Sequence, residues 1–396
     1  MLFVSSFATL ALAIAAVRAG PTGTSQHGLS VSLAAPQSLT SVDGLKIVAS
    51  LTNGGSTDVR VLNFGGILDG GRPTRSFTVS KNGVDAEFRG IEYLLSIPDL
   101  DTSAYTTIRA GQTLRIEHDI SALFDVESLG EGDFDITPMP QLHVMPVGHS
   151  NMTSFAEATG AKTVGTQGLL ELPPAGIRIN LKGDIKRRDL DFPGLVGDGG
   201  GMELGGDDDL EFDEQDEGHI ESRATNICKR NGSWRKTISS SYPGTKKLGA
   251  VARDYVKKNG KSALFKKYFG NQSTKKVADV LNRVAVENDK KRTVDCVASC
   301  KPGVVAYTVF PGSNIFMCPF WFKLGTLYDM CHKGYTGMVK GEAFLHELTH
   351  ATSHTVDASY GCDNDVKLNK ATAINNADSY NCFSKEVWKK TSCGKK

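Results

Sequence analysis

The chain has 396 residues, of which 40% are hydrophobic and 22% are charged. This length leaves room for two or three domains, and this composition excludes both a wholly disordered chain and a multi-span membrane protein. The net charge of +1 hides a strong division, because residues 224–396 hold 29 Lys/Arg against 13 Asp/Glu while residues 1–223 hold 16 against 31. All eight cysteines also lie in the second part. We therefore expect two chemically different regions with separate tasks.

The N-terminus has the pattern of a secretory signal. Residues 1–16 are almost all apolar or small, and small side chains at Val17 and Ala19 suit a signal peptidase. We predict a signal peptide over residues 1–19 and a secreted, extracellular protein. A transmembrane anchor is the alternative, but the apolar run is too short and Arg18 interrupts it. The rest of the sequence shows no membrane span.

The expected compartment determines whether the cysteines are oxidised. An even set of eight cysteines in an oxidising environment indicates up to four disulfides. A zinc ribbon is the competing interpretation, but the sequence holds no Cys-x-x-Cys pair. Three N-glycosylation sequons agree with the secretory route: Asn151, Asn231 and Asn271.

The region after the signal peptide has a β pattern from about residue 29 to residue 185. Short segments rich in β-branched residues alternate with turn clusters such as Asn53-Gly-Gly-Ser56. Clear examples of such segments are Leu45–Leu51, Val59–Phe64 and Phe77–Ser80. The pattern predicts an all-β, sandwich-like domain over residues 20–188. This region holds no cysteine and no cluster of residues with metal-ligand spacing, so we expect no chemistry from it.

An acidic segment separates the two regions. Residues 189–222 contain thirteen Asp/Glu and no Lys or Arg, which predicts a disordered linker over 189–223. The basic triplet Lys186-Arg187-Arg188 precedes this segment, where a processing protease has access. We predict cleavage after Arg188 with trimming at Arg223, which makes residues 20–188 a propeptide. An interdomain tether that is never cut is the alternative.

The C-terminal region, residues 224–396, has mostly helical periodicity. Apolar residues at helical spacing predict helices over Leu248–Lys258, Lys275–Val286, Gly341–Ser353 and Ala371–Trp388. Short apolar runs predict strands over Val304–Phe310 and Ile315–Phe322. We therefore expect a mainly α-helical (α+β) domain with disulfides.

The predicted helix over Gly341–Ser353 carries the strongest chemical motif. His346 and His350 lie four residues apart, which places both imidazoles on one helical face about 6 Å apart along the axis. Glu347 is adjacent to the first histidine and can contact a water held by the metal. This is the HExxH arrangement of zinc peptidases, in which the glutamate is the general base. A surface helix with two solvated histidines is the alternative.

A catalytic zinc ion has three protein ligands and one open position. His354 continues the spacing, but in an unbroken helix it lies about 12 Å along the axis from His346, which is too far for one ion. Glu386 is the only glutamate after the motif and is remote in sequence. Asp357 is the best candidate, because seven residues after His350 give the chain room to leave the helix and turn back.

The motif and the segment after it resemble a known family. His346-Glu-Leu-Thr-His350 followed by Thr355-Val-Asp-Ala-Ser-Tyr-Gly361 is similar to the deuterolysin (aspzincin) family of secreted fungal zinc metalloendopeptidases. Val304-Val-Ala-Tyr-Thr308 and Asn375-Asn-Ala-Asp-Ser-Tyr380 resemble further family segments. The similarity covers residues 228–396, and the preproenzyme layout extends it to the whole chain. It implies a zincin-like catalytic domain over residues 224–396.

The resemblance implies specific roles for residues of this chain. His346, His350 and Asp357 would hold one Zn²⁺ ion, and Glu347 would be the general base. Tyr360 would hydrogen-bond the developing oxyanion; a core tyrosine is the alternative. Asp378 would orient a ligand histidine; a helix cap or an ion-pair partner is the alternative.

The resemblance also bears on the disulfides and on one turn. It implies the pairs Cys228–Cys296, Cys300–Cys318 and Cys331–Cys393, which leaves Cys362 and Cys382 to pair with each other. His354 stands where the family usually has glycine, so the turn before Asp357 must form without a residue that tolerates positive φ freely.

The expected activity is therefore hydrolysis of proteins or peptides by a secreted monomer, which contacts its own propeptide before maturation. One alternative is a structural zinc module in which Asp378 or His354 closes the coordination shell. Another is a non-catalytic basic module that binds polyanionic surfaces through paired lysines. No aromatic residues alternate with these lysines, so we expect no specific nucleic-acid partner. The pairs are Lys257-Lys258, Lys266-Lys267 and Lys275-Lys276.

Overall fold

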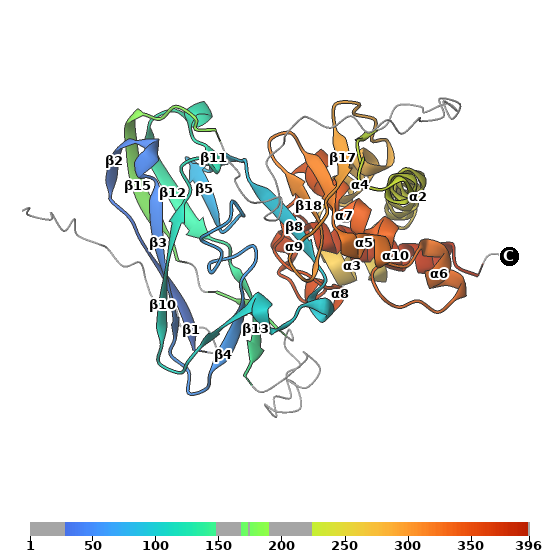
Figure 1. Cartoon of the computed structure of the whole chain (residues 1–396), viewed down its shortest axis with the longest axis horizontal. Helices are drawn as coiled ribbons and strands as arrows, with labels where there is room; N and C mark the ends of the chain where they lie inside the picture. The colour runs from blue at the N-terminus through green and yellow to red at the C-terminus, as the bar shows by residue number, and fades with distance from the viewer. Residues whose placement is uncertain (1–27, 148–167, 173–174, 190–223, 395–396) are drawn as a thin grey trace, which may run out of the picture.

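The computed structural model describes residues 28–147, 168–172, 175–189 and 224–394. Two sequons, at Asn231 and Asn271, lie on the described surface and are exposed. The expected signal peptide, the sequon at Asn151, Arg223 and all of the acidic segment except Asp189 lie outside these residues. Figure 1 shows a sheet-rich part, formed by the N-terminal region, beside a part that carries the helices of the C-terminal region.

The N-terminal region consists of short strands, as the sequence predicts. They form a three-stranded, a four-stranded, a five-stranded and a two-stranded sheet. The sheets are, in strand order, β1 (Leu29–Ala34), β3 (Lys46–Asn53), β10 (Thr113–Asp119); β14 (Leu169–Glu171), β13 (Gln141–Pro146), β4 (Val59–Leu62), β9 (Tyr105–Ile108); β2 (Ser38–Ser41), β15 (Ile177–Asp184), β12 (Gly132–Pro138), β5 (Phe77–Lys81), β6 (Val84–Asp85); and β11 (Phe124–Asp125), β7 (Glu87–Phe88).

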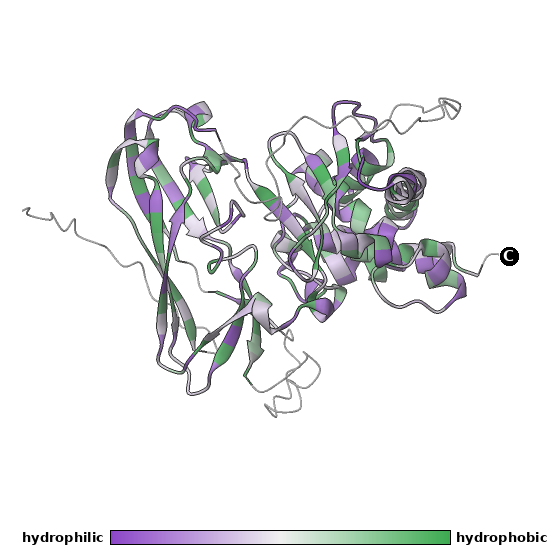
Figure 2. Cartoon of the chain, in the orientation of Figure 1, coloured by the Kyte–Doolittle hydropathy of each residue, from purple (hydrophilic) through white to green (hydrophobic). Residues whose placement is uncertain are grey.

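Alternation of side chains along these strands produces the core of the N-terminal region. Buried and half-buried residues alternate along β1, and Figure 2 shows hydrophobic and hydrophilic residues alternating on the strands of these sheets. The inward side chains of different sheets form one cluster, which includes Leu29, Ile47, Phe77, Phe134 and Ile179.

A further five-stranded sheet joins the two regions of the chain. Its order is β16 (Thr225–Asn226), β17 (Thr293–Cys296), β19 (Asn314–Met317), β18 (Val304–Val309) and β8 (Ile91–Leu95). The first four strands come from the C-terminal region, whereas β8 comes from the N-terminal region and pairs antiparallel with β18. In Figure 1, β8 crosses from the sheet-rich part and lies beside β18. The N-terminal region is therefore not a separate unit attached only by a linker.

The helices of the C-terminal region pack around this sheet. The longer ones, α2, α4, α7 and α10, contact one another and share a core with the sheet. The helices are α2 (Gly232–Asn259), α3 (Ala263–Phe269), α4 (Thr274–Ala285), α5 (Pro319–Lys323), α6 (Leu327–His332), α7 (Lys340–Ser353), α8 (Cys362–Asp365), α9 (Lys370–Ala373) and α10 (Ala377–Thr391).

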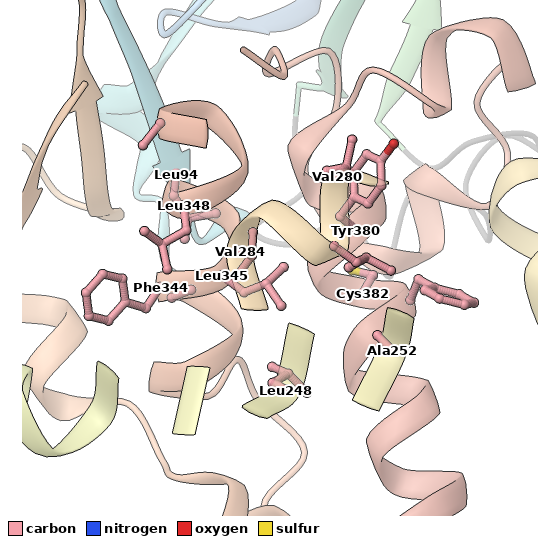
Figure 3. Packing of buried hydrophobic residues seen from close by; sticks show 14 of the residues in the cluster. Leu94, Leu248, Ala252, Val280, Val284, Phe344, Leu345, Leu348, Tyr380 and Cys382 are labelled. Atoms are coloured by element: carbon pink, nitrogen blue, oxygen red, sulfur yellow. The ribbon is translucent and has the colours of Figure 1, made fainter. Parts of the chain in front are cut away.

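Helix α7 is the centre of that core. Phe344, Leu345 and Leu348 are fully buried on it. Figure 3 shows them among side chains of α2 and α4, with Leu94 of β8 close to Leu348. The N-terminal strand thus contributes an apolar side chain to the core behind the HExxH helix.

Three predicted elements of the C-terminal region need correction. The helix expected over Leu248–Lys258 is the second part of the longer α2, which begins at Gly232. The strand expected over Ile315–Phe322 ends at Met317, because Pro319 begins α5; proline lacks an N–H and its φ suits the first turn of a helix. The single helix expected over Ala371–Trp388 is broken between Ala373 and Ala377. Asn376 interrupts it with an extended backbone, φ −87° and ψ 123°.

All eight cysteines are paired in the described residues, and the pairs are those given above: Cys228–Cys296, Cys300–Cys318, Cys331–Cys393 and Cys362–Cys382. Each pair lies within the C-terminal region. Among the residues with a described structure, no helix combines the length and the apolar character that a membrane crossing needs.

Truncation of Phe344 tests the core around α7. This side chain has 0% exposure and packs edge-on against Tyr242 and Trp321. Phe344→Ala is expected to lower the free energy of unfolding by about 3–5 kcal/mol, because it leaves a cavity among rigid neighbours. All three tryptophans lie in the C-terminal region, so urea unfolding followed by tryptophan fluorescence measures this region. Tyr328→Ala, at a side chain 61% exposed, is the control and is expected to change the free energy by no more than about 0.5 kcal/mol.

Candidate metal centre

The HExxH motif lies in the most deeply buried part of α7. His346, Glu347 and His350 each have 0% exposure. In the first turn of the helix, the side chain of Glu342 accepts a hydrogen bond from the Val339 N–H. Buried ionisable groups are costly unless they are paired or bind a metal. Ionisable side chains gathered on one buried face of α7 therefore require charged, hydrogen-bonding or metal partners.

Three ligand-type atoms converge beside this face. The Nε2 atoms of His346 and His350 lie 3.0 Å apart. The Oδ1 atom of Asp357 lies 3.0 Å from the first nitrogen and 3.2 Å from the second. The structure thus brings together the three residues that the sequence analysis named as ligands, in a nearly equilateral triangle.

The outer nitrogens of both imidazoles face oxygen atoms. His350 Nδ1 lies 2.7 Å from the Thr355 carbonyl oxygen, which only accepts, so Nδ1 carries a proton and Nε2 is the nitrogen that faces His346 and Asp357. His346 Nδ1 lies 3.4 Å from Oδ1 of Asp378 on α10 and makes no hydrogen bond within the described residues. Asp378 is thus placed where an orienting partner of His346 belongs. Such contacts fix the ring orientation of a metal-binding histidine.

The loop after α7 brings Asp357 back to the helix. His354 ends α7 in the left-handed conformation, with φ 52° and ψ 38°, so the turn forms with a histidine at positive φ. Asn376 then holds the loop, because its Oδ1 accepts hydrogen bonds from the N–H groups of Ala358 and Ser359. Asn376, the residue that interrupts the expected C-terminal helix, therefore also fixes the loop after Asp357 through its side chain.

One carboxylate oxygen of Glu347 has a hydrogen-bond partner and the other has none. Its Oε2 accepts a hydrogen bond of 2.7 Å from the Thr308 hydroxyl on β18, and its Oε1 has no hydrogen-bond partner. Burial raises the pKa of Glu347 to about 7, against the opposing effect of the two imidazoles. One oxygen is thus anchored and the other is free to accept a proton. The hydroxyl of Tyr360, which is 3% exposed, also has no hydrogen-bond partner.

The charges around the triangle favour a cation. Burial opposes the protonation of both histidines, but Asp357 beside them raises the pKa of each, and the two histidines hold the pKa of Asp357 at about 2 although burial acts to raise it. Without a metal, a proton must sit between the imidazoles and the carboxylate. A divalent cation held there would replace that proton and would also balance the nearby carboxylates of Glu347 and Asp378.

The donor set suits zinc. Zinc bonds to histidine nitrogen and carboxylate oxygen are about 2.0–2.1 Å long, which places neighbouring ligand atoms of a tetrahedron about 3.3 Å apart. The observed separations of 3.0–3.2 Å are close to that spacing. Two imidazoles and one carboxylate are also a set that leaves a fourth corner open.

Other potential ligands do not join this group. Among the described residues, the group of His, Cys, Asp and Glu atoms within reach of one another here has only His346, His350 and Asp357. The ring of His354 packs against Phe310 instead, with ring centroids 5.6 Å apart. Two further groups of potential ligands each include Cys382, whose sulfur is in a disulfide. The arrangement thus gives no support to a fourth protein ligand from His354 or Asp378.

The sequence analysis missed several residues that support the site. Thr308 positions Glu347, and Asn376 positions the loop. Asp365 lies behind Asp378 with 0% exposure, and burial together with Asp378 holds its pKa well above the usual range. The segments around Thr308 and Asn376 were noted only as family segments, and nothing in the sequence signals Asp365.

The N-terminal region covers the site. Glu92 of β8 is 3% exposed, and its Oε1 lies 2.6 Å from Nε of Arg75. The ring of His143 on β13 lies against Tyr360, with centroids 5.5 Å apart, and burial lowers the pKa of His143 to about 4. Both histidine nitrogens lack a hydrogen-bond partner. A part of the chain that the sequence analysis expected to have no role in the chemistry therefore contacts Tyr360 and the HExxH helix.

Exchange of Asp357 tests the third ligand. Asp357→Ala is expected to weaken zinc binding by more than about 100-fold, because loss of an outer partner of a ligand alone costs about 10–100-fold. The measurement is competition for zinc against a chromogenic chelator. His354→Asn is the control, since asparagine tolerates the left-handed conformation, and it is expected to bind zinc as the unaltered chain does. Equal losses in both variants would contradict the assignment.

Two family models match the chain, one near each end. The model described as the deuterolysin metalloprotease (M35) family matches residues 2–137, and the model described as lysine-specific metallo-endopeptidase matches residues 255–385. Neutral protease 2 of Aspergillus oryzae is 25% identical, over 96% of this chain and 97% of that protein. A neutral protease 2 homolog of Arthroderma gypseum is 26% identical, over 86% and 88%.

Among solved structures, a zinc peptidase from Grifola frondosa is 17% identical with a TM-score of 0.34, covering 39% of this chain and 96% of that one. The two family models and the full-length relatives agree with one another. Both ends of the chain thus match models of deuterolysin-type metalloproteases, and proteins named neutral protease 2 are similar to it over nearly its whole length.

Proposed function

We propose that this protein is a secreted zinc endopeptidase that hydrolyses peptide bonds in proteins, with Glu347 as general base. The observation that carries the proposal is the triangle of His346, His350 and Asp357 with the free Oε1 of Glu347 beside it. A zinc ion held there would polarise a substrate carbonyl and acidify a water molecule.

The residues of the chain supply the proton transfers. Glu347 takes a proton from the attacking water on its free oxygen, while Thr308 keeps the other oxygen in place. The same carboxyl then gives this proton to the leaving amine, so no covalent intermediate with the enzyme is needed. The unpartnered hydroxyl of Tyr360 donates a hydrogen bond to the oxyanion of the tetrahedral adduct. Asp378 orients the imidazole of His346.

The layout of the chain supports synthesis as a precursor. Residues 1–19 form the signal peptide, residues 20–188 the propeptide, residues 189–223 the processing segment, and residues 224–396 the catalytic domain. Arg188, at the proposed cleavage point, makes ion pairs with Asp43 and Asp184. All four disulfides lie within the proposed catalytic domain, which therefore stays cross-linked after cleavage. The mature enzyme is a monomer with one zinc ion.

Exchange of the proposed base tests the function. In the processed protein, Glu347→Gln is expected to keep zinc and to lower kcat/KM for a casein-derived peptide by about 10²–10⁴-fold, because the amide cannot accept the proton. Zinc content is measured by the chelator assay and turnover with an internally quenched peptide. Glu386→Gln, which removes a surface contact with Lys267, is the matched control and is expected to keep its activity. Substantial hydrolysis by the Glu347 variant would refute this role.

A further inference from the structure

The two sets of contacts that hold the metal ligands in place meet at one buried carboxyl, that of Asp365 at the end of α8. We propose that Asp365 is a positioning residue of the zinc centre, because its carboxyl holds both the side chain that fixes the ligand loop and the side chain that faces a ligand imidazole. This inference deepens the proposed function and rests on the zinc centre described above. Asp365 acts on that centre only through other residues.

The first contact links Asp365 to the loop that carries Asp357. The side-chain N–H of Asn376 donates a hydrogen bond of 3.1 Å to Oδ1 of Asp365. The amide oxygen of the same side chain accepts hydrogen bonds from the N–H groups of Ala358 and Ser359, which follow Asp357. An amide whose nitrogen is tied to a carboxyl presents its oxygen to the other side. Asp365 therefore sets which way round the amide of Asn376 lies, and the loop depends on that orientation.

The second contact links Asp365 to the residue that faces His346. Carboxyl oxygens of Asp365 and Asp378 lie within 4.8 Å of each other. Oδ1 of Asp378 lies 3.4 Å from Nδ1 of His346. The same carboxylate accepts hydrogen bonds from the Gly361 N–H, at 2.5 Å, and from the side-chain amide of Asn381, at 2.7 Å. Asp365 is thus one of three groups around the carboxylate that stands behind the imidazole.

The close approach of the two carboxyls requires a proton. Asp365 and Asp378 are 0% and 1% exposed. Among the described residues, neither carboxyl forms an ion pair with a lysine or an arginine, and the one ionic contact of Asp378 is with His346. Two buried carboxylates that share a site repel each other, so that one of them takes up a proton. The pair is therefore one neutral acid and one carboxylate.

The proton belongs on Asp365. Asp378 accepts two hydrogen bonds from N–H groups whereas Asp365 accepts one, and such bonds favour the ionised form. Oδ2 of Asp365 is buried and meets no donor, so a proton there converts an unsatisfied contact into a hydrogen bond donated to Asp378. Burial and the neighbouring Asp378 raise the pKa of Asp365 well above its usual range, in agreement with this assignment.

The fold fixes Asp365 between its two partners, which lie where α10 begins. The disulfide Cys362–Cys382 joins α8 to α10. The backbone N–H of Asp365 donates a hydrogen bond of 3.0 Å to the carbonyl of Gly361, and the N–H of Gly361 binds Asp378. The carboxyl of Asp365 is therefore carried by a backbone that is itself tied to the segment it positions.

The test exchanges Asp365 in the full chain. Asp365→Ala removes both contacts. Asp365→Asn keeps them, because its amide oxygen accepts from Asn376 and its N–H donates to Asp378, as a neutral carboxyl does. Asp363→Asn, at an exposed side chain of the same helix, is the matched control. Three quantities are measured: zinc affinity in competition with a chromogenic chelator, the visible spectrum of the cobalt-loaded protein, and the infrared band of protonated carboxyl groups at neutral pH.

Asp365→Ala is expected to weaken zinc binding by about 10–100-fold, the usual loss for an outer partner of a ligand, and to change the cobalt spectrum. Asp365→Asn is expected to match the unaltered chain in zinc affinity and in the cobalt spectrum, but to lose one protonated-carboxyl band. Asp363→Asn is expected to change none of the three. If Asp365→Ala loses its near-UV circular dichroism, Asp365→Ser, which keeps one polar atom where the carboxyl has two, replaces it and is expected to give a smaller loss of affinity.

The outcomes separate this inference from the proposed function. Zinc binding by Asp365→Ala with the affinity of the unaltered chain would overturn the positioning role. Equal losses in Asp365→Ala and Asp365→Asn, or a carboxyl band that persists in Asp365→Asn, would overturn the neutral acid and with it the link to Asp378. If the affinities follow the expected order but no sample hydrolyses an internally quenched peptide, including the processed protein, the peptidase assignment fails and the positioning role of Asp365 stands.

Discussion

Two imidazoles one helical turn apart and a carboxylate from the loop beyond them form the constraint on which the C-terminal region is built. The Nε2 atoms of His346 and His350 and the Oδ1 atom of Asp357 lie 3.0–3.2 Å from one another, and all three residues are buried. Such an arrangement is unfavourable unless a proton or a cation lies between the three atoms. The apolar contacts of α7 hold the two histidines in place despite this cost.

The loop that carries the carboxylate of Asp357 is held by the segment that begins α10. Asn376 accepts two backbone hydrogen bonds from the loop after Asp357, and Asp378, two residues later, faces His346. The disulfide Cys362–Cys382 joins α8 to α10 just behind this loop. The segment that begins α10 therefore fixes both a ligand loop and a ligand ring, so α7 and α10 define the centre together.

The sequence predicted the features that depend on short-range patterns. The spacing of His346 and His350 placed two ligands on one helix, and the axial distance argued against His354, which the structure places against Phe310. The helix over Gly341–Ser353 and the strand over Val304–Phe310 agree with α7 and β18 to within one residue. The disulfide pairs came from the family resemblance, because eight cysteines allow 105 connectivities.

The features that the sequence could not predict depend on tertiary contacts. The break at Asn376 follows from hydrogen bonds to a loop eighteen residues earlier, which no local propensity reports. Asp365 is recognised only by its burial next to Asp378. β8 looks like any other strand of the N-terminal region, because the pattern of Ile91–Leu95 does not say which sheet it joins. Its pairing with β18 therefore changes the interpretation of the whole N-terminal region.

X-ray absorption at the zinc edge of the zinc-loaded processed protein tests the central claim most directly. The account predicts one zinc ion bound by two imidazole nitrogens and one carboxylate oxygen at about 2.0–2.1 Å, with one further oxygen from solvent. A sulfur ligand, a third imidazole, or a shell closed by four protein ligands would contradict it.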